Sequence, residues 1–378
     1  MAQMAQLQSS SMPGNGAEGG GSQGAPAPES VSERFDPFEL AIVLSHYELG
    51  VIRSIGRLRR GSVKTPKLLI TTDRGQFVLK RRSADQADPL RVRFAHAVQT
   101  RLASSGFPLP PLVPTRAVAS DASRSLFVIK GRSYELFRFS SGQGYDKSTM
   151  QTFAAGQGLA MFHNVTSPLA SAHEPSSRGL PASYHDNEMI PSVLRELAMR
   201  MTNGADANFL AEMYEAAASR VNNAGFDRWP VQVIHGDWHP GNAIFHGDRL
   251  VAVIDYDTAR LGRRALDIAS AAVQFSIEII PGDPGQWPSE LDEARLVAMI
   301  RGYESLTDAD GHPLEHISRA ELGALPDLMI ESLIAETAGP IATTGAFGLH
   351  GPAKMLGVTR RKAQWIADHG DRLARAFD

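Results

Sequence analysis

The chain has 378 residues and 43 % of them are hydrophobic, which is enough for about two domains with buried cores. Its 38 basic and 41 acidic residues give a formal net charge of −3, which argues against nucleic acid or a membrane surface as a partner, because both usually need a basic excess. The sequence has no cysteine, so disulfides, zinc–thiolate sites and cysteine nucleophiles are excluded, and a reducing, cytoplasmic location is expected.

Residues 1–33 are mostly Gly, Ser, Gln, Ala and Pro. This composition cannot bury enough apolar surface to offset the entropy of the chain, so we predict a disordered tail. The tail lacks the basic start and apolar run of a signal peptide, and nothing later in the chain approaches the roughly 18 apolar residues of a membrane span. Beyond the tail we expect an N-terminal lobe at 34–140 and a C-terminal lobe at 141–378.

Patterns typical of β-strands dominate the predicted N-terminal lobe. A short amphipathic helix at 37–46 precedes them, and Pro89 begins a longer helix whose apolar residues recur every fourth position until Gly106. Strand patterns occur at 50–58, 67–72, 76–80, 126–130 and 133–139. The order of three strands, one helix and two strands predicts an antiparallel five-stranded sheet with one major helix.

Helical periodicity prevails in the predicted C-terminal lobe, where one strand-rich island at 231–254 interrupts it. Helices are expected at 153–163, 191–201, 209–222, 265–278, 291–303, 317–338 and 353–377. Strands and helices are thus largely segregated along the chain, which indicates an α+β protein whose C-terminal lobe is mostly helical.

A loop with glycine and serine between the first two strands resembles a P-loop without matching it. In GRLRRGSVKT, residues 56–65, the lysine comes two residues late, and a strand follows where a P-loop needs a helix N-terminus. A loop between antiparallel strands can still cover phosphates with its backbone N–H groups. Gly61, Ser62 and Lys64 are therefore candidate nucleotide-binding residues, and an ordinary basic hairpin loop is the equal alternative.

The strand-rich island carries the residues best suited to chemistry. Its sequence, VQVIHGDWHPGNAIFHGDRLVAVIDYD at 231–257, predicts an apolar strand that delivers Asp237 to a tight loop, followed by a hairpin. The hairpin is expected to place Asn242 opposite residue 253 and within about 7 Å of Asp255. Two carboxylates and one amide then converge, and hard oxygen ligands of this kind suit Mg²⁺.

The order Asp-x-x-x-x-Asn followed by a second Asp is the arrangement found in kinase-type phosphoryl transfer. One Asp positions the acceptor hydroxyl, while the Asn and the later Asp hold metal ions on the nucleotide phosphates. Such a site also needs a cation for the phosphates on a strand of the other lobe. Lys80, which ends the third predicted strand, meets this requirement.

Two segments resemble a known family. HGDWHPGN at 235–242 and VIDYDTARLGRRALDIA at 253–269 closely resemble the signature of the aminoglycoside phosphotransferase and choline kinase-like family. The earlier HYELG…GSVKTPKLLITTDRGQFVLKRR, within 46–82, is similar to the homoserine-kinase and spore-coat-kinase-like branch. The resemblance extends over roughly residues 38–376 and implies a two-lobed protein-kinase-like fold that binds ATP and Mg²⁺ between its lobes.

The resemblance also implies roles for individual residues. Asp237 is then the catalytic aspartate, Asn242 and Asp255 are metal ligands, and Lys80 is the phosphate-binding lysine. The implied reaction is transfer of the γ-phosphoryl group of ATP to a hydroxyl of a small-molecule acceptor, namely an amino acid, amino sugar, amino alcohol or related metabolite. A monomer or a homodimer is expected to perform it.

Three further residues are expected to support the loop that carries this site. The resemblance implies that His235 braces the loop and that Asp267, at the start of a helix, receives backbone N–H groups from it. His239 is expected to stabilise the loop by hydrogen bonding rather than to bind a metal.

The chain departs from the family pattern at one position. Kinase-like folds usually pair the strand lysine with a glutamate on the following helix, and the corresponding position here is Gln99. The helix that begins at Pro89 contains no acidic residue. Either Gln99 or His96 therefore holds Lys80 by hydrogen bonding, or Lys80 is held less firmly.

Other functions are compatible with parts of this pattern. His235, Asp237 and His239 alternate as ligands of a metallohydrolase would, but no further histidine shows ligand spacing. The main alternative to a small-molecule kinase is a catalytically weak or inactive pseudokinase that binds nucleotide or a partner, because the helix lacks the acid. A kinase that phosphorylates protein side chains is a further alternative. The resemblance does not name the acceptor, so homoserine, choline-like alcohols, amino sugars and aminoglycosides all stay open.

Overall fold

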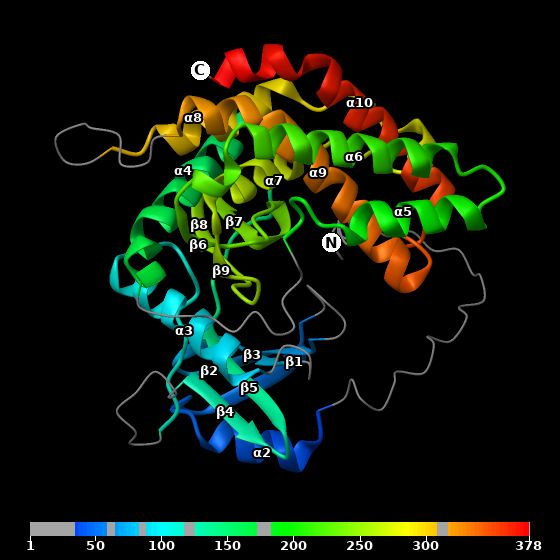
Figure 1. Ribbon diagram of the computed structural model, residues 1–378. Helices are drawn as coiled ribbons and strands as arrows, with labels where there is room; N and C mark the ends of the chain where they lie inside the picture. Colours follow the sequence, from blue (N-terminus) through cyan, green and yellow to red (C-terminus); the bar gives the residue numbers. More distant parts are fainter. Residues whose placement is uncertain are drawn as a thin grey trace, which may run out of the picture. The chain divides into compact units, whose positions relative to one another are not determined.

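The structure of the protein is a computed structural model, which describes residues 35–58, 65–82, 88–116, 125–171, 183–307 and 317–377 (Figure 1). The described residues divide into two compact units. The first unit contains the described residues before Leu90 together with Pro111–Phe139, and the second contains Leu90–Pro110 and Ser140–Asp378. The units thus differ from the expected lobes by the segment Leu90–Pro110. The predicted tail lies outside the described residues.

The first unit is built on a five-stranded antiparallel sheet with the strand order β1-β2-β3-β5-β4. Strands β1 to β5 span Ile52–Arg57, Lys67–Thr72, Gly75–Arg81, Leu126–Ile129 and Arg132–Arg138. The predicted sheet is therefore confirmed. The neighbours of β3 are β2 and β5, and β4 lies at the edge of the sheet beyond β5. The strand that carries Lys80 is therefore central.

One face of this sheet packs against helix α2, Pro37–Ser45. The helix begins where Asp36 accepts a hydrogen bond from the backbone N–H of Glu39 at 2.8 Å, with proline in the first turn. Alternate strand residues point toward α2 and form a buried core with it, namely Leu68, Ile70, Phe77, Leu79, Tyr134 and Leu136. The residues between them, including Lys80, lie on the opposite face.

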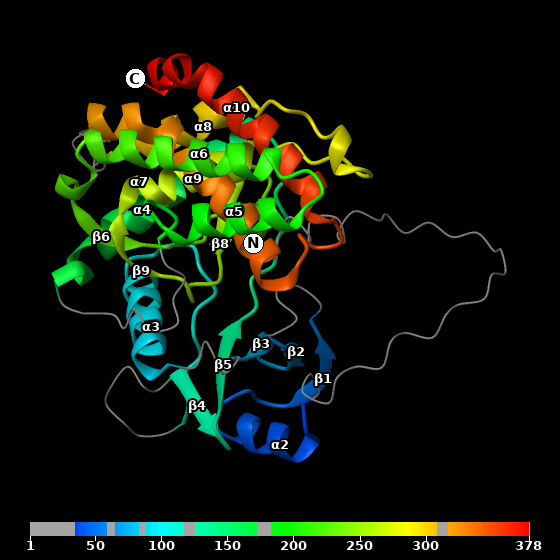
Figure 2. The same ribbon diagram turned by 45° about the vertical axis from the view of Figure 1, so that its right-hand side comes forward.

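The second unit is mostly helical, as predicted. Helices α3 to α10 span Pro89–Ser104, Thr149–Thr166, Met189–Arg200, Ala205–Asn223, Arg264–Ser276, Glu293–Glu304, Arg319–Thr344 and Pro352–Phe377. Helix α9 packs against α6, α7 and α10 (Figures 1 and 2). Among the described helices, none combines the length and the apolar character that crossing a membrane requires.

Helices α4 and α8 approach each other closely because glycines lie at their crossing. A Cβ at Gly156 would lie 2.2 Å from the carbonyl oxygen of Met299, and a Cβ at Gly302 would lie 2.1 Å from the carbonyl oxygen of Phe153. Alanine at either position would push the helices apart, since packed backbones cannot absorb such an overlap. The crossing therefore fixes the positions of the side chains that follow it on both helices.

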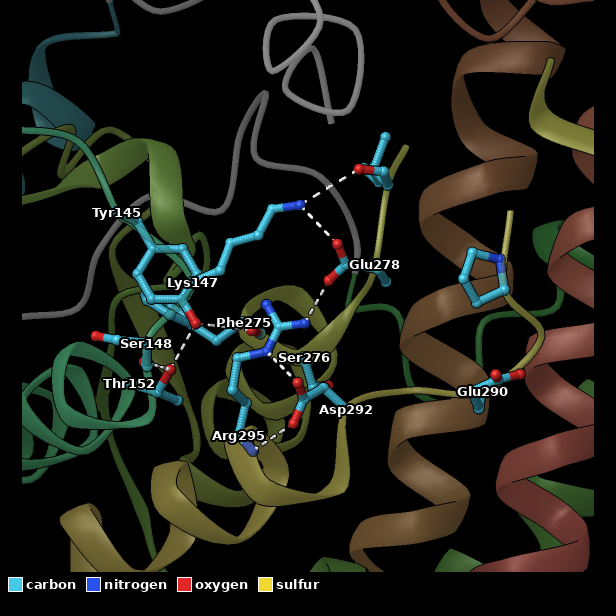
Figure 3. A network of polar contacts seen from close by, with 12 residues as sticks. Tyr145, Lys147, Ser148, Thr152, Phe275, Ser276, Glu278, Glu290, Asp292 and Arg295 are labelled. Carbon is cyan, nitrogen blue, oxygen red and sulfur yellow. Dashed lines mark hydrogen bonds and ion pairs between the residues drawn. The ribbon is translucent and has the colours of Figure 1, made fainter. Parts of the chain in front are cut away.

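The segment that enters the second unit is tied to α7 and α8 by polar contacts (Figure 3). The Nζ of Lys147 donates to Glu278 at 2.8 Å, and the other carboxylate oxygen of Glu278 accepts from Arg295 at 2.6 Å. The hydroxyl of Tyr145 donates to the carbonyl oxygen of Phe275 at 3.0 Å. These contacts fix the C-terminal end of α7.

Candidate active site

The loop at residues 235–242, which we call the catalytic loop, begins in a conformation that requires glycine. It follows β6, Val231–Ile234, which pairs with β9, Arg260–Arg263. Gly236 has φ +74°, and a Cβ there would lie 2.8 Å from the carbonyl oxygen of Thr258. Only glycine fits both conditions, so the chain turns sharply directly before Asp237.

Asp267, in the first turn of α7, anchors the catalytic loop. Its carboxylate accepts the backbone N–H of His235 at 2.6 Å and that of Gly236 at 2.8 Å. The Nε2 of His163 lies 3.1 Å from the same carboxylate, and the other ring nitrogen of His163 lies 2.8 Å from the hydroxyl of Tyr303. Burial raises the pKa of Asp267, but the hydrogen bond and charge of His163 outweigh burial and lower it. A buried, ionised carboxylate thus holds the first two residues of the loop through their backbone N–H groups.

Asp237 is held by two neighbours in the catalytic loop. The Nδ2 of Asn242 donates to the backbone carbonyl of Asp237 at 3.0 Å and to its carboxylate at 3.2 Å. The Nε2 of His239 lies 3.4 Å from the same carboxylate, while its Nδ1 accepts the N–H of Gly241 at 2.8 Å. Burial raises the pKa of Asp237, but the charge and hydrogen bond of His239 hold it well below its usual range. Asp237 is therefore an oriented anion at neutral pH.

The hairpin after the catalytic loop has a different register from the expected one. Strands β7, Ala243–His246, and β8, Arg249–Val253, pair with Ala243 opposite Val253, so the prediction that Asn242 lies opposite residue 253 is wrong by one residue. The cause is a bulge between Ile244 and Phe245, which adds one residue to β8. Asn242 instead accepts the backbone N–H of Ile254 at 2.9 Å, which still brings Asn242 close to Asp255.

Asp255 follows this hairpin in an unusual backbone conformation. It is exposed and has φ +67°, in the left-handed region that few residues other than glycine adopt. Two residues later the carbonyl oxygen of Asp257 accepts a hydrogen bond from Arg91 of α3 at 2.9 Å. Non-glycine residues in this region cost about 1–3 kcal/mol and concentrate at functional sites, so the conformation itself marks Asp255 as a candidate.

His235 supports the loop from the interior. Its side chain is fully buried, its Nδ1 accepts the N–H of Asp237 at 3.3 Å, and its Nε2 has no hydrogen-bond partner among the described residues. Burial lowers the pKa of His235, which keeps the ring neutral. The ring packs against Phe162 and Tyr256. Its contact with Asp237 is to the backbone N–H, so it supports the loop rather than the carboxylate.

In the first unit, Lys80 lies near the end of β3 and is largely buried. The other predicted nucleotide-binding positions, Gly61, Ser62 and Lys64, lie outside the described residues. Gln99 is buried on α3, where its side-chain amide donates to the carbonyl oxygen of Ala95 on its own helix at 3.1 Å. Its expected contact with Lys80 joins the two units and stays a prediction.

Glu336 on α9 is a candidate that the sequence pattern did not single out. Its carboxylate accepts hydrogen bonds from Ser270 at 3.3 Å and from the side-chain amide of Gln274, both on α7. Burial raises the pKa of Glu336 to about 7, and the charge of Asp237 adds to the effect. Glu336 is one of four acidic residues of α9 and belongs to no motif, so only the three-dimensional approach of α9 to α7 distinguishes it.

Residues 57–316 match the sequence model of the phosphotransferase enzyme family, and the chain therefore belongs to that family. The resemblance carried by the two motif segments is confirmed. The protein is accordingly a phosphotransferase that acts on a hydroxyl group.

Individual relatives agree with this assignment. The homoserine kinase of Brucella ovis is 27 % identical over 309 residues, which cover 79 % of this chain and 82 % of that protein. The structure of a microcompartment-associated aminopropanol kinase has a TM-score of 0.63 at 15 % identity and covers 90 % of this chain and 99 % of that one. An amicoumacin kinase in complex with AMP-PNP and Ca²⁺ has a TM-score of 0.60 at 10 % identity, over 89 % and 95 % of the two chains. These likenesses confirm the predicted protein-kinase-like fold.

Proposed function

We propose that the protein is an ATP-dependent kinase that transfers the γ-phosphoryl group to a hydroxyl of a small metabolite bearing an amino group. The observation that carries this proposal is the pair of Asp237 and Asn242, in which one ionised carboxylate is fixed by hydrogen bonds beside an amide. Asp255 directly follows Ile254, whose N–H the backbone carbonyl of Asn242 accepts. Phosphoryl transfer depends mainly on such positioning and on charge stabilisation.

In this proposal Asp237 orients the acceptor. Its low pKa keeps it anionic, so it accepts a hydrogen bond from the acceptor hydroxyl at neutral pH. A weak base suffices for this chemistry, because the transition state is loose and the hydroxyl does not have to lose its proton before the phosphoryl group arrives. Asn242 and His239 hold the carboxylate in place before the acceptor binds.

Asn242 and Asp255 are the residues that would hold Mg²⁺. The Nδ2 of Asn242 donates to Asp237, so its Oδ1 is the atom suited to a metal, and Asp255 adds an exposed carboxylate. Both donors are hard oxygens, which fit Mg²⁺ better than zinc. When bound, the metal would neutralise charge on the nucleotide phosphates.

The sheet face opposite α2 is the proposed surface for the nucleotide. Lys80 lies on this face, where it would bind phosphates. Near it on the same face are three half-buried apolar side chains, Leu69, Val78 and Phe137. Apolar surface suits a purine, and a cation at its edge suits the phosphates that follow, so ATP is the nucleotide that we propose.

The class of acceptor is inferred from relatives and from one side chain. The homoserine kinases and the aminopropanol kinase are both named for acceptors with an amino group and a hydroxyl. Glu336, once ionised, would attract the ammonium group of such a compound toward the side of α7 that also carries Asp267. An amino acid, an amino alcohol or an amino sugar would each satisfy this requirement.

The test is an ADP-release assay with the full chain, MgATP and a panel of homoserine, aminopropanol, choline, an amino sugar and an aminoglycoside. We expect acceptor-dependent ADP release that Asp237→Asn lowers by a factor on the order of 10²–10⁴. The matched control Asp248→Asn removes an exposed acid from the turn of the neighbouring hairpin and should retain activity. MgATP binding without ADP release for any acceptor would favour the nucleotide-binding module instead.

A further inference from the structure

The sheet of the first unit surrounds Lys80 with charged residues from neighbouring strands. In the ladder register, Lys80 of β3 lies directly opposite Lys67 of β2 on one side and Glu135 of β5 on the other. Directly opposite residues in an antiparallel pair point to the same face, with Cβ atoms about 4.5–5.5 Å apart. Glu135 is therefore the acidic neighbour of Lys80 within the sheet.

Glu135 lies where burying an ionised carboxylate costs free energy unless cations pair with it. Its side chain is fully buried, and its Oε1 lies 2.8 Å from the Nη2 of Arg82. Arg82 is two residues after Lys80, so both point to the face that Glu135 shares. Lys67, Lys80 and Arg82 place positive charge around this carboxylate, which compensates for the cost of burying it.

The helix that would normally supply an acid to the strand lysine has none. Helix α3 reads PLRVRFAHAVQTRLAS, and the amide of Gln99 donates to the carbonyl oxygen of Ala95 on its own helix. An acid on the neighbouring strand can replace the helix glutamate, because the sheet holds that acid opposite Lys80 independently of the position of α3. Its position is fixed by backbone hydrogen bonds rather than by packing between elements.

We propose that Glu135 is the positioning residue for Lys80, and that a strand carboxylate here takes the part that a helix glutamate plays in other kinase-like folds. The inference rests on the proposed function of Lys80 as the phosphate-binding lysine. In this arrangement Arg82 shares the carboxylate and holds it in place, and Lys67 is the only titratable group opposite Lys80 on the β2 side of the described sheet. Lys80 is then held in the binding orientation before nucleotide arrives.

The test measures how readily Lys80 reacts, without any need for activity. The full chain without nucleotide is labelled by reductive methylation at a series of pH values, and mass spectrometry of peptides reports Lys80 separately from other lysines. Glu135→Gln keeps the size of the side chain and an acceptor for Arg82 but removes the negative charge. Because a nearby anion favours the charged, unreactive form of an amine, we expect the pH midpoint of Lys80 labelling to fall by about one unit in this variant.

Glu39→Gln is the matched control. Glu39 is also a buried acid of the first unit and pairs with Arg132 at 2.8 Å, but it contacts Tyr134, which points to the opposite face of the sheet from Glu135. It should leave the Lys80 midpoint unchanged. Lys130, exposed in the turn between β4 and β5, serves as the internal reference in every variant. An unchanged midpoint in Glu135→Gln, or an equal shift in Glu39→Gln, overturns the proposal.

A second variant decides the matter if Glu135→Gln fails to fold. Arg82→Gln removes the competing cation, so the Lys80 midpoint should rise rather than fall, and a fall would overturn the proposal. Nucleotide affinity is measured in parallel on the wild-type chain. If the wild type binds no MgATP, the proposed function fails while the labelling result still stands. If it binds MgATP and Glu135→Gln shifts nothing, only the role of Glu135 is refuted.

Discussion

The substitution Asp267→Asn tests how far the catalytic loop depends on its buried anchor. The carboxylate accepts two backbone N–H groups of the loop and lies within hydrogen-bonding distance of His163. Asparagine has the same shape but only one accepting oxygen, so its NH₂ group would face one of these donors. A hydrogen bond to a charged group contributes about 1.5–3 kcal/mol. Losing one and weakening the others should lower the free energy of unfolding by about 3 kcal/mol.

The effect on catalysis should exceed the effect on stability. The N–H groups that lose their acceptor belong to the two residues directly before Asp237, so the candidate catalytic carboxylate moves when they do. A displacement of about 1 Å can cost about 10²-fold in rate. We expect kcat to fall by this order, with a smaller change in KM for ATP, in steady-state assays at a temperature where urea denaturation shows the variant to be folded.

A chemically similar pair elsewhere in the same unit provides the control. Glu331 is fully buried, lies 2.9 Å from the Nδ1 of His185 and accepts the N–H of Asp186 at 3.0 Å. Glu331→Gln alters a buried acid of the same unit without touching the catalytic loop, so kcat should stay near the wild-type value. Burial raises the pKa of Glu331, so losing its charge should cost less stability than losing that of Asp267. The reasoning is refuted if Asp267→Asn retains normal kcat, or if both variants lose kcat equally, because the loss would then follow from general destabilisation.

Three other substitutions separate the remaining roles. Asp237→Asn should lower kcat by a factor on the order of 10²–10⁴ while MgATP affinity, measured by calorimetry, stays near the wild-type value. Asp255→Ala should abolish the gain in nucleotide affinity that Mg²⁺ provides, and chelation of zinc should leave the wild type active. Glu336→Gln should flatten the pH dependence of thermal stability between about pH 4.5 and 7, measured by melting temperature.

Much of the fold and the motif region could be predicted because the relevant information is local. Alternating apolar residues indicated the strands of the first unit, and Pro89 indicated the start of α3. Asp237 and Asn242 are five residues apart in one loop, so their spacing alone suggests that they meet. The structure joins them by a direct hydrogen bond.

What could not be predicted depends on contacts between distant segments. His163 of α4 contacts Asp267 and is itself contacted by Tyr303 of α8, and no pattern in either helix indicates that their crossing brings these side chains together. The place of Glu135 beside Lys80 depends on β5 lying next to β3, although β4 and α3 intervene in the sequence. A single bulged residue also shifted the expected register of the β7–β8 hairpin, because short-range patterns do not specify bulges.

Glu336 links the stability of the second unit to its proposed acceptor. Burial and the charge of Asp237 raise its pKa to about 7 from the usual 4.5. Between these values the folded chain binds more protons than the unfolded chain, so stability falls as pH rises, by at most about 3 kcal/mol for this group. The same ionisation creates the charge that would attract an ammonium group, so KM for an amino-bearing acceptor should fall as pH rises through 7. Glu336→Gln should remove both trends, and an unchanged pH profile of that KM would show that the amine binds elsewhere.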